Sequence, residues 1–131
     1  MKKHVIPDTN VILRYLLNDH QEHFRHANDF FDKVFSGEQP ALILESVVAE
    51  CLYVLLKAYS VPKEDAAHSL IELLRYKGIV NKEKQELISA LNLFEKTGLD
   101  FVDCVVLAKA GASKFEVFTF DKQMIKVSRQ I

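Results

Sequence analysis

The sequence predicts an α/β protein in which helices cover both faces of a short, mainly parallel β-sheet. Short segments rich in apolar residues alternate along the chain with longer segments of helical spacing. Strands that are separated by helical crossovers form parallel sheets, which are normally buried on both faces. Hydrophobic residues make up 49% of the 131 residues, which is enough for a substantial core. We therefore expect a single domain over residues 1–131.

Short apolar segments mark the expected strands. The first covers residues 3–7, and Pro7, which has no N–H to donate, suits the end of a strand. The compact segment ALILE (41–45) is the second, and FEVFTF (115–120) is the last clear strand. GIV (78–80) is a possible short strand between them. This order places strands and helices in alternation along the whole chain.

Apolar residues at helical spacing predict the helices between these strands. Thr9 or Asn10 is placed to cap the first helix, and Ser46 is placed to cap the third. Pro62 suits the first position of the fourth helix, which Gly78 would end. The expected ranges are 11–17, 21–36, 46–59, 62–77, 82–97 and 100–111.

Composition sets broad limits on location and partners. The formal net charge is −1, which neither favours nor excludes a nucleic-acid partner. No apolar run reaches the roughly 20 residues that a membrane helix needs, and the N-terminus turns polar too early for a signal peptide. Cys51 and Cys104 lie far apart in apolar contexts, so we expect them to fill the core rather than form a disulfide. A soluble cytoplasmic protein is expected.

Carboxylates follow the first and the last of the expected strands. Asp8 follows the first and Asp121 the last, and the carboxyl ends of parallel strands share one edge, where ligands bind. Thr119 lies two residues before Asp121, so its side chain shares a face with that acid. Asp103 lies in the first turn of the helix that Asp100 would cap. Its alternative role is only to favour the helix dipole.

Glu50 is unusual because it lies in the strongly apolar helix SVVAECLYVLLKAY. At 100° per residue it borders the face expected to be buried. The alternative is an ordinary boundary glutamate whose stem packs and whose carboxylate reaches water.

If these four acids lie close together, the repulsion between their negative charges must be offset. Two like charges about 4 Å apart cost about 4 kcal/mol at an effective dielectric near 20. Protonation of one acid offsets that cost, and so does a hard divalent cation such as Mg²⁺ or Mn²⁺. Such a cation is suited to activating water and to neutralising a phosphate. No P-loop, dinucleotide-binding or serine-hydrolase motif occurs in the chain.

Four segments carry a family resemblance that covers nearly the whole chain: IPDTNVILRYLL, SVVAECLYVL, LDFVDCVVLAKA and VFTFDK. The chain resembles the PIN domain, and in length and pattern it is similar to the VapC-type toxin ribonucleases. The resemblance implies a three-layer α/β/α sandwich with four or five strands and a metal-dependent endoribonuclease. It also implies a homodimer and an antitoxin that blocks the site. Pro7 departs modestly from the commoner apolar residue before the first acid.

The resemblance assigns the acidic site residue by residue. Its catalytic and metal-binding acids fall on Asp8, Glu50, Asp103 and Asp121, of which Asp8 and Asp103 would hold Mg²⁺ or Mn²⁺ most directly. The polar residues of the family pattern match Thr9, Asn10 and Thr119. Asn10 and Thr119 would orient Asp8 and Asp121 by hydrogen bonds. Basic side chains near the cleft would position the phosphates of single-stranded RNA, and the candidates are Arg14, Lys57 and Lys122.

Two alternatives stay open. The chain could be a non-catalytic PIN-like module that binds RNA or protein, although all four acids are present. It could also be another Mg²⁺-dependent α/β domain, such as a receiver or a phosphatase of the haloacid dehalogenase type. The phosphatase motif needs a second Asp at position 10, where this chain has Asn.

Overall fold

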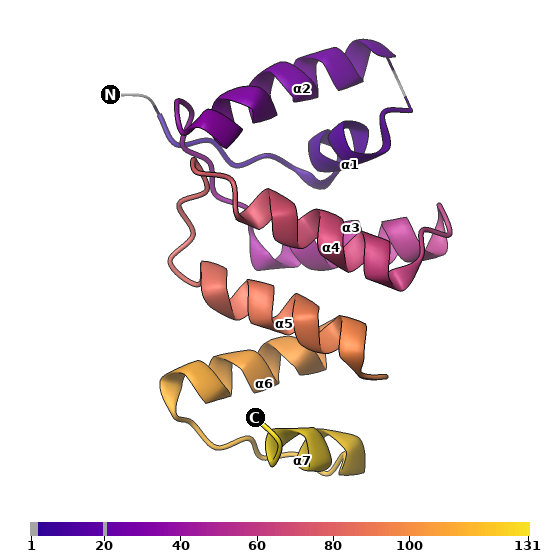
Figure 1. Cartoon of the computed structure of the whole chain (residues 1–131), viewed down its shortest axis with the longest axis vertical. Coiled ribbons are helices and arrows are strands. Elements are labelled where there is room, and N and C mark those ends of the chain that lie inside the picture. The colour runs from indigo at the N-terminus through magenta and orange to yellow at the C-terminus, as the bar shows by residue number, and fades with distance from the viewer. Residues whose placement is uncertain (1–2, 20) are drawn as a thin grey trace. The chain divides into compact units, whose positions relative to one another are not determined.

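The computed structural model describes residues 3–19 and 21–131. Within these residues the chain forms seven helices (Figure 1). It divides into two compact units, Met1–Lys82 (unit 1) and Glu83–Ile131 (unit 2). Unit 1 contains α1 (Thr9–Leu17), α2 (Gln21–Ser36), α3 (Glu45–Lys57) and α4 (Lys63–Leu74). Unit 2 contains α5 (Lys84–Lys96), α6 (Phe101–Ser113) and α7 (Lys122–Ser128).

Helix packing builds a separate apolar core in each unit. In unit 1, α1 packs against α2 and α3, and α3 packs against α4. In unit 2, α6 packs against α5 and α7. Fully buried side chains include Ile12, Phe31 and Leu52 in unit 1 and Leu87 and Leu91 in unit 2. No helix in the described part of the chain is both long and apolar enough to span a membrane.

The three N-terminal segments expected to be strands do run parallel to one another in unit 1. Val5 and Ile79 each form a parallel bridge with Ala41, which is fully buried. The Val5 carbonyl accepts from the Leu42 N–H (2.9 Å), and the Ala41 carbonyl accepts from the Val80 N–H (2.9 Å). The predicted parallel direction is therefore confirmed for these segments. The pairing does not extend beyond single bridges, so the predicted strands were too long.

A buried asparagine explains why the pairing stops after Val80. The Asn81 side chain accepts from the Ile43 N–H (3.0 Å) and donates to the Ile43 carbonyl (2.6 Å). Its amide therefore satisfies the backbone groups that the next strand residue would otherwise bind. On the other side of Ile43, α3 already begins at Glu45, so the predicted strand 41–45 cannot extend to its expected end.

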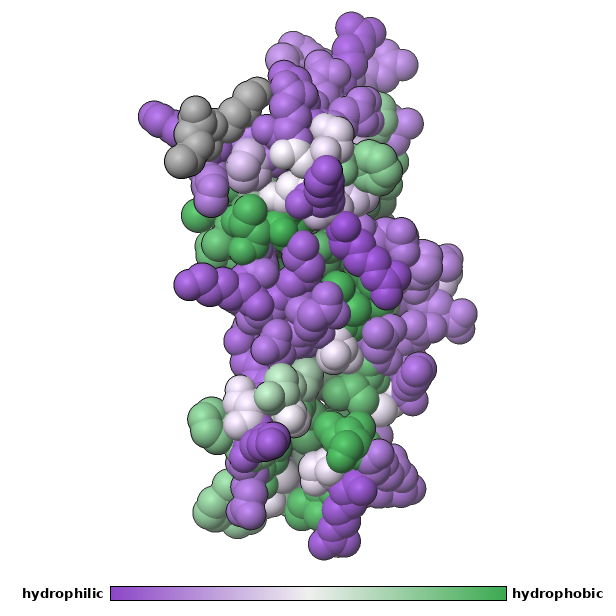
Figure 2. All heavy atoms as spheres, turned by 60° about the vertical axis from the view of Figure 1, so that its left-hand side comes forward, coloured by the Kyte–Doolittle hydropathy of each residue, from purple (hydrophilic) through white to green (hydrophobic). Residues whose placement is uncertain are grey.

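The predicted strand 115–120 is not formed, and the described residues contain no strand longer than a single bridge. Phe118 and Phe120 are 89% and 90% exposed. Their ring centroids lie 5.5 Å apart. Hydrophobic surface is also exposed among hydrophilic side chains on the face seen in Figure 2. An alternating apolar segment becomes a strand only where a neighbouring strand binds its backbone. The predicted sheet of four or five strands is therefore absent from unit 2.

Aspartates cap two of the helices. Asp8 is the N-cap of α1 and its Oδ1 accepts from the Val11 N–H (3.0 Å), so the cap expected at Thr9 or Asn10 was placed wrongly. Asp121 is the N-cap of α7 and accepts from the Met124 N–H (2.9 Å). The sequence did not predict α7.

The predictions for other helix ends were partly right. Asp100 occupies the N-cap position of α6, as expected, but its side chain makes no capping hydrogen bond, unlike those of Asp8 and Asp121. Ser46 lies inside α3, whose N-cap is Leu44, so that prediction was wrong. Pro62 is the N-cap of α4 rather than its first residue, and α4 ends at Leu74, before Gly78.

The Asn81 bridge should contribute measurably to stability. We expect Asn81→Ala to lower the free energy of unfolding by about 1–3 kcal/mol, because it leaves the buried N–H and C=O of Ile43 without partners. Urea denaturation measures this loss. Asn28→Ala is the matched control, because Asn28 lies on α2 and makes one long side-chain hydrogen bond, to Asp32 (3.3 Å). An equal loss in both variants would contradict this role for Asn81.

The two capping aspartates allow a second test of stability. We expect Asp8→Ala to cost about 1 kcal/mol of unfolding free energy, whereas Asp8→Asn should cost a few tenths at most, because asparagine caps about as well as aspartate. The same pair of substitutions at Asp121 should behave in the same way. Urea denaturation of the four variants measures the difference. If alanine and asparagine are equally tolerated, the side chains do not act as caps.

Candidate active site

The parallel pairing around Ala41 brings the first turns of α1 and α3 together. Residues 5–8 lead from the Val5 bridge into α1, and residues 41–44 lead from Ala41 into α3. Both helices therefore start from the same edge of the paired segments, and they pack against each other. The Thr9 hydroxyl on α1 donates a hydrogen bond to Oε1 of Glu50 on α3. Asp8 directly precedes Thr9, so this contact places both predicted acids of unit 1 at one site.

An open pocket of about 610 Å³ lies between the two helices. We call it the α1–α3 pocket. Its two carboxylates are Asp8 and Glu50, and Arg14 and Tyr59 also line it. The remaining lining residues are Thr9, Asn10, Leu13, Val47, Val54 and Ala58. A second pocket of the same unit, between α1 and α2, also reaches Asp8, Asn10 and Arg14, so these three side chains are accessible from two sides.

Glu50 lies on the pocket face of α3 and not at the border of its buried face. Its side chain is exposed, whereas the buried residues of α3 are Val48, Cys51, Leu52 and Leu55. The sequence-based orientation of α3 was therefore wrong by part of a turn, because Val47 is only partly buried and Val48 is buried. An exposed Glu50 can present its carboxylate to a ligand.

Cys51 fills the core beside the two acids, as predicted. It is fully buried, and so is Cys104. Burial, followed by the nearby carboxylates of Glu50 and Asp8, raises the pKa of the Cys51 thiol to about 12. The thiol therefore stays protonated at neutral pH and is unsuited to act as a nucleophile.

The other two predicted acids lie in unit 2. Asp103 is partly buried in the first turn of α6, and Asp121 is exposed at the start of α7. The Thr119 hydroxyl accepts from the Asp121 N–H (3.0 Å) and donates weakly to Sδ of Met124 (3.6 Å). Thr119 thus orients the backbone of Asp121 rather than its carboxylate.

The structure brings Asp8 and Glu50 together, whereas Asp103 and Asp121 belong to the other unit. Among residues 3–19 and 21–131, no group of three or more His, Cys, Asp or Glu side chains is placed to hold a metal ion. The pair in unit 1 fits a hard cation by its chemistry. Each carboxylate uses one oxygen in a hydrogen bond, to Val11 or Thr9, and has a second oxygen. Mg²⁺ and Mn²⁺ prefer such oxygen ligands.

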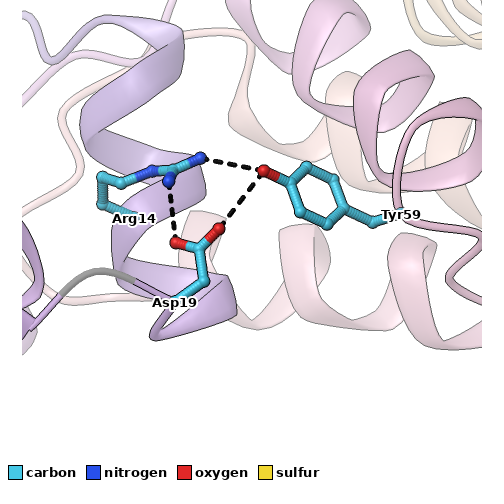
Figure 3. A network of polar contacts seen from close by, with 3 residues as sticks. All are labelled: Arg14, Asp19 and Tyr59. Atoms are coloured by element: carbon cyan, nitrogen blue, oxygen red, sulfur yellow. Dashed lines mark hydrogen bonds and ion pairs between the residues drawn. The ribbon is translucent and has the colours of Figure 1, made fainter.

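The predicted phosphate-binding residues occupy three different environments. Lys57 is exposed in the last turn of α3, and Lys122 is exposed as the first residue of α7. Arg14 is held by an ion pair to Asp19 (2.8 Å) and donates to the Tyr59 hydroxyl (3.1 Å), as Figure 3 shows. The hydrogen bond with Tyr59 is the largest cause that raises the pKa of Arg14 above its usual value.

The sequence did not single out Asp19 or Tyr59. An acid five residues after Arg14, just beyond the end of the same short helix, could have suggested an ion pair. Tyr59 is separated from Arg14 by 45 positions, and no sequence pattern connects them.

Comparisons with known proteins agree with the resemblance seen in the sequence. The chain is similar to a VapC ribonuclease of Aquifex aeolicus (strain VF5), with 26% identity over 122 residues that cover 92% of this chain and 89% of that protein. No solved structure matches the chain significantly. The family model described as "PIN domain" matches residues 5–130. Because this match spans nearly all 131 residues, the chain belongs to the PIN domain family.

Proposed function

We propose that this chain is a Mg²⁺- or Mn²⁺-dependent endoribonuclease, the toxin of a toxin–antitoxin pair. The observation that carries the proposal is the pair of carboxylates, Asp8 and Glu50, in one pocket of a PIN domain. The similarity to a VapC ribonuclease supports RNA as the substrate. A single domain over residues 1–131 and a cytoplasmic location are parts of the same proposal.

The acids of the pocket hold the cation in this proposal. Asp8 offers the oxygen that its cap does not use, and Thr9 holds Glu50 by a hydrogen bond beside it. Asp103 and Asp121 complete the ligand set. Asn10 helps to orient Asp8, whereas Thr119 binds the backbone of Asp121 rather than its carboxylate. A cation held there would supply Lewis acidity toward water and toward the negative charge of the phosphate. Arg14, Lys57 and Lys122 bind phosphates of the RNA backbone.

Completion of the site requires unit 2 to contribute its acids. We propose that the complete site belongs to the three-layer α/β/α sandwich that the family resemblance implies, with Asp103 and Asp121 among its acids.

The proposed partners rest on the family. A cognate antitoxin would block the acidic site with a peptide segment, and two copies of the chain would form a homodimer. The alternative is a non-catalytic PIN-like module, which is favoured by one observation. Asp8 and Asp121 both cap helices, so a protein without nuclease activity would still need them.

An amide substitution separates catalysis from capping. We expect Asp8→Asn to reduce RNA cleavage at least about a hundredfold while the protein stays folded, because asparagine keeps the cap but removes the ligand charge. The assay is cleavage of single-stranded RNA with Mg²⁺ or Mn²⁺, with and without EDTA. Asp29→Asn on α2 is the matched control and should keep full activity. Undiminished cleavage by Asp8→Asn, or cleavage that EDTA does not stop, would refute the nuclease assignment. A wild-type protein that binds RNA without cutting it would support the non-catalytic alternative.

Paramagnetic NMR tests whether the four acids share one ion. We expect Mn²⁺ to broaden the backbone signals of Asp8, Glu50, Asp103 and Asp121 at the same low concentration, because all four would lie within one coordination site. Asp8→Asn should weaken the broadening at all four positions. Broadening confined to Asp8 and Glu50 would show that unit 2 does not contribute to the site.

A further inference from the structure

A second group of polar side chains lies at the α1–α3 pocket, besides Asp8 and Glu50. There Arg14 contacts Asp19 and Tyr59, and the Tyr59 hydroxyl in turn donates to Oδ2 of Asp19 (3.2 Å). The three side chains form a closed triangle of polar contacts (Figure 3). Arg14 and Tyr59 line the same pocket as Asp8 and Glu50.

The triangle fixes the guanidinium group and leaves it unused donors. A guanidinium group has five N–H donors, and the contacts with Asp19 and Tyr59 use one on each terminal nitrogen. The Arg14 Nε–H is buried, so it is not among the donors that a ligand in the pocket would reach. The side chain is 22% exposed and lines the pocket, where the donors left on the terminal nitrogens are those open to a ligand.

The position of Arg14 relative to the acids suits a polymeric substrate. On α1, Arg14 lies five residues after Thr9, which is about 7.5 Å along the helix axis. The Thr9–Glu50 hydrogen bond joins α1 to α3. The Arg14–Tyr59 hydrogen bond joins α1 to the segment that follows α3. All four residues line the same pocket. The rise from Thr9 to Arg14 is more than one helical turn, so Arg14 and the acids would contact different parts of an extended ligand in the pocket.

We propose that Arg14 binds the RNA phosphate next to the scissile one, and that Tyr59 and Asp19 are positioning residues that hold its guanidinium fork. The proposal rests on the proposed ribonuclease function. Arginine binds phosphate through two parallel N–H donors, and its affinity depends on the orientation of that fork. A guanidinium that is already held in place loses less conformational freedom when the phosphate binds.

Equilibrium binding in a cleavage-deficient background tests the subsite. All proteins carry Asp8→Asn, and the probe is a short fluorescent oligouridylate in Mg²⁺ at salt concentrations from about 50 to about 200 mM. We expect Arg14→Gln to raise the Kd about tenfold. It should also make the slope of log affinity against log salt shallower by about 0.7, the value for one phosphate contact on a single strand.

Conservative variants test separately whether Arg14 binds a phosphate and whether Tyr59 positions its guanidinium group. Arg14→Lys should keep the salt slope, because it keeps the charge, but should raise the Kd severalfold because the fork is lost. Tyr59→Phe should raise the Kd about threefold with an unchanged slope, a pattern that loss of stability alone would not produce. Arg75→Gln is the matched control, because Arg75 is exposed, pairs with Glu72 and lies outside the pocket residues. It should leave both quantities unchanged.

The outcomes distinguish this proposal from the proposed function. If the wild-type protein neither binds nor cuts RNA, both fail. If the Asp8→Asn protein binds RNA and Arg14→Gln changes neither the Kd nor the slope, only the subsite is refuted. An equal effect of Arg75→Gln would also refute it, because the loss would then reflect overall charge. If Arg14→Gln does not fold, an unchanged Kd in Arg14→Lys is sufficient to overturn the proposal.

Discussion

The parallel backbone pairing of Ala41 with Val5 and Ile79 is the constraint on which the candidate site depends. It fixes two chain segments side by side and in the same direction, so that the helices that follow them start together. The N-cap of α1 and the first turns of α3 then lie at one edge, and Glu50 comes within reach of the Thr9 hydroxyl. Few backbone hydrogen bonds define this arrangement, and the buried side chains around them supply most of the stabilising free energy.

Much of the helical structure could be predicted from the sequence because helices are stabilised locally. The bounds of α2 agree with the prediction, and the ends of α5 and α6 differ from it by one or two residues. Apolar spacing and cap residues lie within a few positions of each other and are visible in the sequence. The cap of α1 was misplaced because Asp8, Thr9 and Asn10 are all good N-caps, and only the backbone conformation selects among them.

The sheet and parts of the site could not be predicted because they depend on contacts that are distant in sequence. Asn81 ends the pairing through a contact with Ile43, 38 positions away, and a polar residue after a short apolar segment gives no sign of this role. Helical periodicity placed Glu50 beside the buried face, because it cannot tell which neighbouring helix covers α3. Tyr59 was missed for the same reason. The four acids and Arg14 stand out in the sequence because charged residues at strand and helix ends are conspicuous, and their shared site stays a prediction.

The shared role of Asp8 has a consequence for inactive forms of the protein. The Asp8 carboxylate caps α1 and also lines the pocket. An amide at this position would keep the cap but remove the negative charge. Under selection against the proposed toxicity, Asp8→Asn could inactivate the protein without unfolding it. Proteolysis would then not remove the inactive protein. The inactive protein would stay folded and would still bind any partner that recognises its surface. Inactive copies would then compete with active copies for that partner.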